Sequence, residues 1–423
     1  MSLAQHCENS VMKCAYIVDA IRSPMGKKNG ALSALHPVDL GAYLIDELVK
    51  RNSLPTDAID DLVFGVVNQV GAQGGNLARN VGLSSSLSTS VPGTTIDRQC
   101  GSSLQALQFA AQAVMSGTQG LVVAGGVEAM SLVPIGSSIL DGAKCSRGRP
   151  KGQRLEQAYP GVKFNQFDGA EMLAEKYQIT REELDTFGLE SHRRAAHARS
   201  HGYFLKETIP LPTSDFDSDG PLVTDDECIR VDASIEAMRS LKPLRDNGFI
   251  TAGTASQISD GAAVVLVAGA DAIARFALKP RAKIIAFEVI GSDPVMMLEG
   301  PIPATESLLA KAGLCIADID LYEINEAFGS VPLAWLKALK ADPEKLNVNG
   351  GAQALGHPLG ASGARLIVTL LHELERRGLR YGLAAVCEGG GTANAMIIES
   401  VSAEDFADPA VPVHHPYNPM MRL

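Results

Sequence analysis

The sequence predicts an α/β protein made of two similar α/β/α layered halves with an α-rich loop domain inserted between them. Short apolar runs without period-two alternation are interleaved with stretches of helical spacing, which is typical of strands covered by helices on both faces. Two such stretches repeat one plan of helix, short turn, apolar strand and glycine pair. The region between them is polar and charged and contains few strand-like runs.

The first elements are a strand over 15–20 and a helix over 40–49, where leucines recur every four residues. The first copy of the repeated plan is a helix over 101–116 that ends at Gly117, followed by an apolar strand. The second copy is a helix over 361–377 that ends at Gly378. Glycine directly after a helix is a common stop signal. Other strand-like runs lie at 62–67, 121–124, 262–267, 284–289, 383–386 and 395–398.

These patterns predict four parts. An N-terminal half over 14–130 is completed by 251–277, and the inserted loop or lid domain covers 131–250 with helices near 169–177 and 181–197. A C-terminal half follows over 278–400. The last segment, 401–423, carries four prolines and is expected to form an irregular tail.

Composition narrows the functional classes. A chain of 423 residues exceeds the size of about 250–300 residues at which single cores stop growing. Its 48 acidic and 37 basic residues give a formal net charge of −11, which disfavours nucleic acid and anionic lipid as partners. The longest uncharged run is half polar, so we expect no membrane insertion. We expect no secretory signal and a cytoplasmic location.

The seven cysteines include no C-x-x-C pair, so neither a disulfide framework nor a metal site is expected. One of them, Cys100, comes after a β-type stretch and directly before a helix. Free N–H groups at a helix N-terminus favour a thiolate, which is the nucleophilic form of cysteine. The alternative is that Cys100 is a small buried hydrophobic residue.

A nucleophilic thiol needs a base, and His357 is the best placed histidine because glycines surround it and allow a ligand to approach the backbone. Cys387 ends an apolar strand before three glycines and could act as a second acid and base. It could also be a core cysteine or a redox partner of Cys100. Gly389 could offer its N–H to an oxyanion. Asn325 could donate to an oxyanion or simply cap a helix that opens at this point.

The chain resembles the thiolases in four blocks that occur in the family's order. They are the Cys100 segment, NEAF at 325–328, GHPLGASGAR at 356–365 and CEGGG at 387–391. The opening AYIVDAIRSPMGKKNGAL and the segment TAGTASQISDGAA are also similar to thiolase sequences, so the resemblance covers nearly the whole chain.

The resemblance implies reversible acyl transfer between a 3-ketoacyl-CoA and CoA through a thioester on Cys100, with acetyl-CoA released. His357 would activate Cys100, and Cys387 would exchange protons with acetyl-CoA and CoA. One oxyanion hole would use His357 and a water held by Asn325. The other would use the backbone N–H groups of Cys100 and Gly389. No bound cofactor and no metal are implied, because CoA and acyl-CoA are substrates.

Substrate contacts are less well defined by the sequence. The resemblance implies that Ser256 contacts pantetheine and that Phe328 borders the substrate. Arg149 and Lys151 lie in a basic stretch that could meet the CoA phosphates or could be a solvated loop. Two family patterns are altered, because Cys-Ala-Ser-Gly is replaced by Cys-Gly-Ser-Ser at 100–103 and Asn-Ala-Ser-Gly by Thr-Ala-Ser-Gln at 254–257.

The expected function is degradative, in fatty-acid or related acyl-CoA β-oxidation. The alternatives are a biosynthetic acetoacetyl-CoA thiolase, a ketosynthase-type condensing enzyme and a catalytically silent acyl-CoA-binding subunit. Ketosynthases typically use two histidines, whereas this chain has Cys387 at the late position. The resemblance also implies a homodimer or homotetramer, with a β-oxidation complex as a further partner. The acyl chain length is not defined by the sequence.

Overall fold

The computed structural model describes residues 13–212 and 221–401. Most of the strands belong to one sheet path with the order β10-β11-β12-β9-β1-β8-β5-β3-β4. The predicted tail over 401–423 lies outside the described residues except for Val401. Within the described ranges, no helix combines the length and apolar character needed to cross a bilayer.

The N-terminal part of the sheet consists of β4, β3, β5, β8 and β1. Strand β8 comes late in the chain, yet it lies between β5 and β1 and runs antiparallel to both. The bounds of these strands are Tyr16–Arg22 (β1), Asp61–Gly65 (β3), Gly93–Ile96 (β4), Leu121–Ala129 (β5) and Ser259–Ala268 (β8), and the short β2 (Gly26–Lys27) also pairs with β8.

The C-terminal part consists of β9, β12, β11 and β10. Among the described strands, it pairs with the N-terminal part where Tyr16 and Ile17 of β1 lie beside Lys283 and Ala282 of β9. The bounds are Ala282–Gly291 (β9), Leu321–Ile324 (β10), Tyr381–Glu388 (β11) and Thr392–Ser400 (β12). The division of the chain at the four predicted boundaries remains a prediction.

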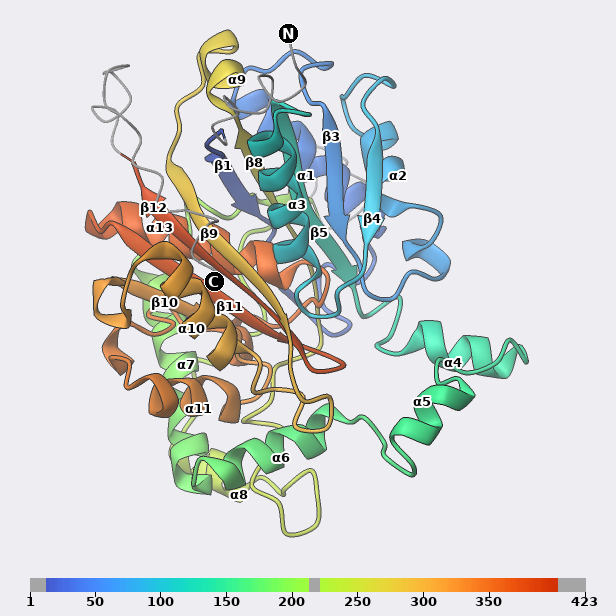
Figure 1. The fold of residues 1–423 in the computed structure, drawn as a ribbon, viewed down its shortest axis with the longest axis vertical. Coiled ribbons are helices and arrows are strands. Elements are labelled where there is room, and N and C mark those ends of the chain that lie inside the picture. The colour runs from blue at the N-terminus through green and yellow to red at the C-terminus, as the bar shows by residue number, and fades with distance from the viewer. Residues whose placement is uncertain (1–12, 213–220, 402–423) are drawn as a thin grey trace, which may run out of the picture.

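Two helices lie between the two parts of the sheet (Figure 1). They are α3 (Ser102–Ser116) and α13 (Ser362–Arg377), which pack against each other and against strands on both sides. Each ends at a left-handed glycine, Gly117 or Gly378, as predicted. Helices α1 (Pro37–Arg51) and α2 (Leu77–Ser84) cover the N-terminal strands, and α10 (Pro301–Ala312) covers β9 and β12. The predicted duplicated layers are therefore confirmed.

The inserted segment over 131–250, called the lobe from here on, consists mainly of helices in its described residues. The predicted helical stretches correspond to α6 (Gln166–Lys176) and α7 (Arg181–Ser200), and Thr180 with Glu183 forms a capping box that starts α7. Helices α4 (Ser137–Lys144) and α5 (Gln153–Ala158) contain no buried residue and project from the body at the right of Figure 1. The remaining elements are α8 (Ile235–Ser240), β6 (Leu211–Pro212), β7 (Leu222–Val223), α9 (Ala270–Arg275), α11 (Ser330–Leu339) and α12 (Ala352–Leu355).

A buried ion network fixes the lobe to the core. Arg22 of β1 is completely buried and donates to the carboxylates of Glu207 and Asp226 at 2.6–2.9 Å. Removing one member would leave an unpaired buried charge, which typically costs about 3–5 kcal/mol. The lobe is therefore held in a defined position beside the central helices.

The close crossing of α3 and α13 depends on Gly363. A Cβ at this position would lie 2.4 Å from the backbone nitrogen of Leu104. We expect Gly363→Ala to reduce the free energy of unfolding by about 1–3 kcal/mol through overpacking. Gly142→Ala in α4 is a matched control, because no atom lies within 4 Å of its Cβ and alanine favours a helix. Urea unfolding would measure both, and equal stabilities would contradict the expectation.

Candidate active site

Cys100 lies in the turn between β4 and α3, directly before the first turn of the helix, as the sequence predicts. The turn requires a left-handed Gln99, with φ of 48°. Ser102 secures it, because its hydroxyl accepts from Arg98 N at 2.9 Å and donates to Gln99 O at 2.6 Å. The thiol is thereby held at the helix N-terminus, and Cys100 is 8% exposed.

The thiol is not activated by this position alone. Burial raises the pKa of Cys100 to about 12, and the charges of Glu388, Glu128 and Asp97 act in the same direction. The backbone N–H at the helix N-terminus lowers the pKa as expected, but burial and the nearby carboxylates raise it by more. Cys100 needs a base to remove its proton.

His357 is buried in the loop between α12 and α13, and its backbone N–H donates to Gln257 O at 3.1 Å. The hydroxyl of Ser362 lies 2.5 Å from His357 Nδ1 and donates to Pro358 O at 2.9 Å. Because a serine hydroxyl has one proton and here donates it to Pro358 O, the hydrogen-bond network assigns the proton of the His357 contact to Nδ1. Nε2 is consequently the basic nitrogen. Sequence reasoning missed Ser362, although it lies within the GHPLGASGAR block.

The imidazole is neutral under ordinary conditions. Burial, with a smaller effect from Arg365, lowers the pKa of His357 to about 3. Since the protonated form exists only below this value, we expect no titration of the ring between pH 5 and 8. Histidine ring NMR shifts, with the signal assigned by its loss in His357→Gln, would test this. An inflection near pH 6.5 would contradict it.

Asn325 follows β10, and its backbone N–H donates to Ala385 O of β11 at 3.0 Å. Its side chain is completely buried, with Nδ2 3.3 Å from His357 Nε2. Its Oδ1 has no hydrogen-bond partner among the described residues. Helix α11 begins at Ser330 with Gly329 as its N-cap, so the alternative that Asn325 caps a helix is wrong. The amide faces the His357 ring instead.

Cys387 lies near the end of β11 and is 1% exposed. Burial raises the pKa of its thiol well above the ordinary range, and ionisation of Cys100 raises it further. The two thiols are free in the structure and interact electrostatically. A Cβ on Gly389 would lie 3.0 Å from Gln99 Oε1, so the turn after β11 packs against the residue before Cys100.

A cavity of about 200 Å³ opens beside His357. Ser256 and Phe328, both predicted to contact substrate, line it together with this histidine. The backbone N–H of Ser256 donates to Ala327 O at 3.0 Å, which joins this segment to the NEAF block. The remaining lining is mostly apolar: Met130, Ile135, Gln166, Phe167, Ala255, Gln257, Ile258, Ala327 and Leu359.

The altered residue Gln257 has a defined role in this wall. Its side-chain Nε2 donates to Cys228 O at 2.9 Å and to Gln353 O at 2.8 Å. It therefore ties the lobe to the segment that leads into His357. Thr254 is buried and its hydroxyl accepts from Thr251 N at 2.9 Å, so this alteration also fixes the local backbone.

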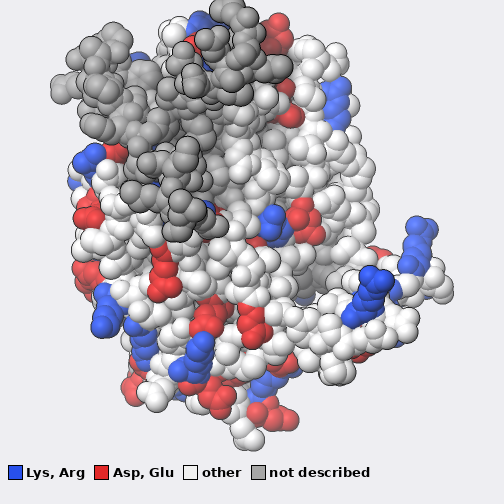
Figure 2. All heavy atoms as spheres, in the orientation of Figure 1, with Lys and Arg blue, Asp and Glu red and all other residues white. Residues whose placement is uncertain are grey.

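Arg149 and Lys151 do not line this cavity. They belong to the projecting arm of α4 and α5, where Figure 2 shows basic side chains on an exposed surface. The ammonium of Lys151 donates to Val162 O and lies 4.5 Å from the centre of the Phe164 ring. Their contact with CoA phosphates remains a prediction.

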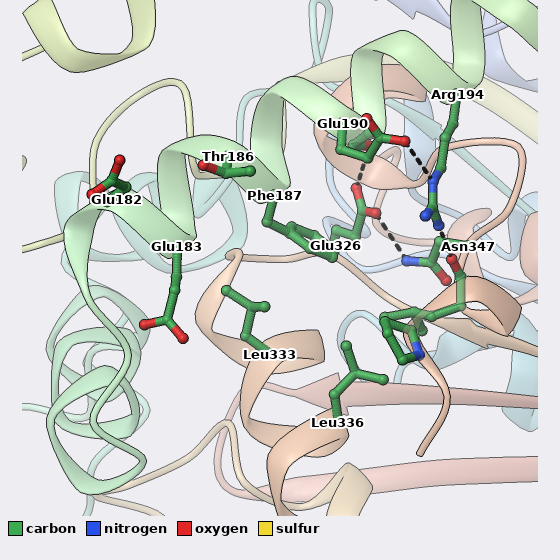
Figure 3. Close-up of a pocket in the computed structure, with 13 residues that line it drawn as sticks. Glu182, Glu183, Thr186, Phe187, Glu190, Arg194, Glu326, Leu333, Leu336 and Asn347 are labelled. Carbon is green, nitrogen blue, oxygen red and sulfur yellow. Dashed lines mark hydrogen bonds and ion pairs between the residues drawn. The ribbon is translucent and has the colours of Figure 1, made fainter. Parts of the chain in front are cut away.

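A second cavity, of about 350 Å³, lies between α7 and α11 (Figure 3). Glu326 closes its inner end by accepting from Ser191 Oγ at 2.7 Å and Asn347 Nδ2 at 2.9 Å. The glutamates Glu182, Glu183 and Glu190 also line it, which makes it a poor site for phosphates. Among the described residues, no cluster of His, Cys, Asp or Glu is arranged to hold a metal ion.

Comparisons with known proteins agree with this arrangement. The family model of the thiolase N-terminal domain matches residues 15–271, and that of the thiolase C-terminal domain matches residues 278–400. The chain belongs to the thiolase family. The predicted resemblance is confirmed, and the protein is an acyltransferase of the thiolase type that acts on acyl-CoA and CoA.

Several relatives match almost end to end. The chain is 48% identical to the steroid 3-ketoacyl-CoA thiolase FadA6 of Mycobacterium tuberculosis, over 92% of this chain and 95% of the relative. It is 43% identical to a 3-ketoacyl-CoA thiolase of Klebsiella pneumoniae, over 92% of this thiolase and 100% of the relative. The crystal structure of the Bacillus anthracis acetyl-CoA acetyltransferase matches with a TM-score of 0.85 and 38% identity, covering 93% of this chain and 100% of the other.

Proposed function

We propose that this thiolase cleaves 3-ketoacyl-CoA substrates with CoA, using Cys100 as the nucleophile and His357 as its base. The observation that carries the proposal is the hydrogen-bonding arrangement of His357. It assigns the proton to Nδ1 and leaves Nε2 facing Asn325 beside the cavity lined by Ser256 and Phe328. His357 is unprotonated and can therefore accept the proton of Cys100, and the imidazolium and thiolate that form together stabilise each other's charge.

In the first half-reaction, His357 Nε2 takes the proton of Cys100 and the sulfur attacks the 3-keto carbon. The bond between C2 and C3 then breaks, which leaves the acyl group on Cys100 as a thioester and acetyl-CoA as an enolate. The thiol of Cys387 protonates C2 of this enolate. Its raised pKa supports the role, because a neutral thiol is required at this point.

In the second half-reaction, the thiolate of Cys387 removes the proton of the incoming CoA thiol. The CoA sulfur attacks the thioester, Cys100 leaves, and the proton held by His357 returns to it. The net change is one carbon–carbon bond broken, with a new C–H bond in acetyl-CoA and a new thioester on CoA. Each thiol therefore ends the cycle protonated.

Both half-reactions develop negative charge on an oxygen. We infer that the tetrahedral intermediate on Cys100 is stabilised by the N–H groups of Cys100 and Gly389, a choice supported by the packing of Gly389 against Gln99. We infer that the enolate oxygen is held by His357 and by a water bound to Asn325. The unpartnered Oδ1 of Asn325 supports this, because it can accept from such a water.

The degradative direction is supported by relatives whose names specify 3-ketoacyl-CoA, steroid 3-ketoacyl-CoA and β-ketoadipyl-CoA as substrates of those proteins. We infer that no resident cofactor takes part, since the side chains and the thioester supply the chemistry. We also propose a homodimer or homotetramer in the cytoplasm. Sedimentation showing a stable monomer would contradict the oligomer.

The test is CoA-dependent release of acetyl-CoA from a panel of 3-ketoacyl-CoAs with short, long, branched and polycyclic acyl groups. We expect release with at least one member of the panel and no release without CoA. Binding of the panel without any acetyl-CoA would contradict the proposal and favour an acyl-CoA-binding subunit.

A further inference from the structure

The residue after the second thiol, Glu388, is completely buried at the end of β11. Its carboxyl oxygen Oε1 lies so close to Gly101 that a Cβ at this glycine would be 1.8 Å from it. Gly101 follows Cys100 and stands where the family pattern has alanine. The carboxyl of Glu388 therefore occupies space that an alanine side chain would need, directly beside the nucleophile.

Two further side chains hold this carboxyl in place. The hydroxyl of Thr392 lies 2.5 Å from Glu388 Oε2. The amide of Asn394, oriented with Nδ2 toward Oε1 at 3.2 Å, also accepts from Gln105 N at 3.2 Å. A threonine hydroxyl can donate to a carboxylate or accept from a carboxylic acid. The site can therefore hold either protonation state of Glu388 without a change of partners.

The charges around this carboxyl leave it poorly neutralised. No ion pair within the described ranges includes Glu388, and the charged side chains that act on it are Arg98 and Asp97, which have opposite effects. Burial raises the pKa of Glu388 to about 8. Glu388 in turn provides the largest charge effect on Cys100, ahead of Glu128 and Asp97, and it also acts on the thiol of Cys387.

We propose that Glu388 is a positioning residue for the thiols of Cys100 and Cys387. Whether its own carboxyl is protonated controls how readily these thiols ionise. As a neutral acid it leaves Cys100 free to give its proton to His357, and as a carboxylate beside Gly101 it opposes a thiolate at this point. Gly101 stands in place of the family's alanine, and the carboxyl of Glu388 fills the space of its methyl group. The ionisation of Cys100 then depends on a second buried proton, the one on Glu388. This inference rests on the proposed role of Cys100.

The test is the rate at which iodoacetamide alkylates Cys100 between pH 6 and 10, measured on the Cys100 peptide by mass spectrometry. Removing a nearby negative charge lowers the pKa of a thiol, so Glu388→Gln should be alkylated at least about tenfold faster than the parent at pH 8. Asp97→Asn is the matched control. Asp97 also raises the pKa of Cys100, but less than Glu388 does, and its side chain is exposed, so its effect should stay within about threefold.

Superposable pH profiles of the parent and Glu388→Gln would overturn the proposal, as would equal shifts in the glutamine and Asp97→Asn variants. If Glu388→Gln does not fold, the double variant Gly101→Ala with Glu388→Ala replaces it, because the added methyl fills the space of the carboxyl. The double variant should show the same shift, and a parent-like profile would overturn the proposal. An alkylation shift in a protein that forms no acyl adduct would contradict the proposed function and leave this inference standing.

Discussion

Cys100→Ala is expected to reduce kcat for thiolysis by at least about 10⁴-fold, because no thioester can form without the sulfur. The substitution removes one small atom from a buried turn whose shape is held by Ser102, so the fold should persist. Steady-state release of acetyl-CoA would measure the loss, and the melting temperature would verify the fold.

Cys228→Ala is the matched control for this variant. Cys228 is also buried, at 2% exposure, and its thiol pKa is also raised to about 12 by burial. It lies in the lobe, where its backbone oxygen accepts from Gln257 and its sulfur packs near Gly356, at 3.1 Å from the position of a Cβ on that glycine. We expect its kcat to stay within a few-fold of the parent. Equal losses in the two cysteine variants would contradict the assignment of the nucleophile.

His357→Ala is expected to lower kcat/KM by about 10³–10⁴-fold. The variant loses the base that must remove a proton from a thiol of raised pKa, and it loses a donor of the proposed enolate site. In this variant no imidazole is left to take the proton of Cys100. Raising the pH should recover part of the activity, because it ionises the Cys100 thiol directly. Rates of acetyl-CoA release at pH 7 and pH 9.5 would show this recovery.

His192→Ala is the control for the loss of a buried imidazole. Burial lowers the pKa of His192 to about 4, and its Nδ1 accepts from Arg230 N at 3.2 Å. It lies on α7, away from the cavity beside His357. We expect a loss of stability with kcat/KM nearly unchanged. A similar collapse of kcat/KM in both variants would assign the effect to folding instead of proton transfer.

The layered fold could be predicted because the signals for its helices and strands lie within short segments of the sequence. The helices α3 and α13 show helical spacing and end at glycines, and the strands β5 and β11 that follow them are continuous apolar runs. The sequence suggested a helix that opens at Asn325, whereas α11 begins at Ser330. Residues 325–329 continue from β10 without regular structure because Asn325 bonds to β11 and Ser256 bonds to Ala327.

The candidate site residues could be proposed from the sequence, but their electrostatics could not. The position of Cys100 before a helix is visible in the sequence, whereas the raised pKa of its thiol depends on burial and on charges from segments far along the chain, such as Glu388. The tautomer of His357 depends on the direction of one serine hydroxyl, and the importance of Glu388 depends on its contact with Gly101. These effects arise only when the two halves are brought together.

The most direct test of the account is the intact mass of the protein after mixing with a cleaved 3-ketoacyl-CoA in the absence of free CoA. The account predicts one acyl adduct on the Cys100 peptide, which disappears when CoA is added and is absent in Cys100→Ala. Acetyl-CoA release without an adduct in the parent, or an adduct that persists in Cys100→Ala, would contradict the proposed covalent mechanism.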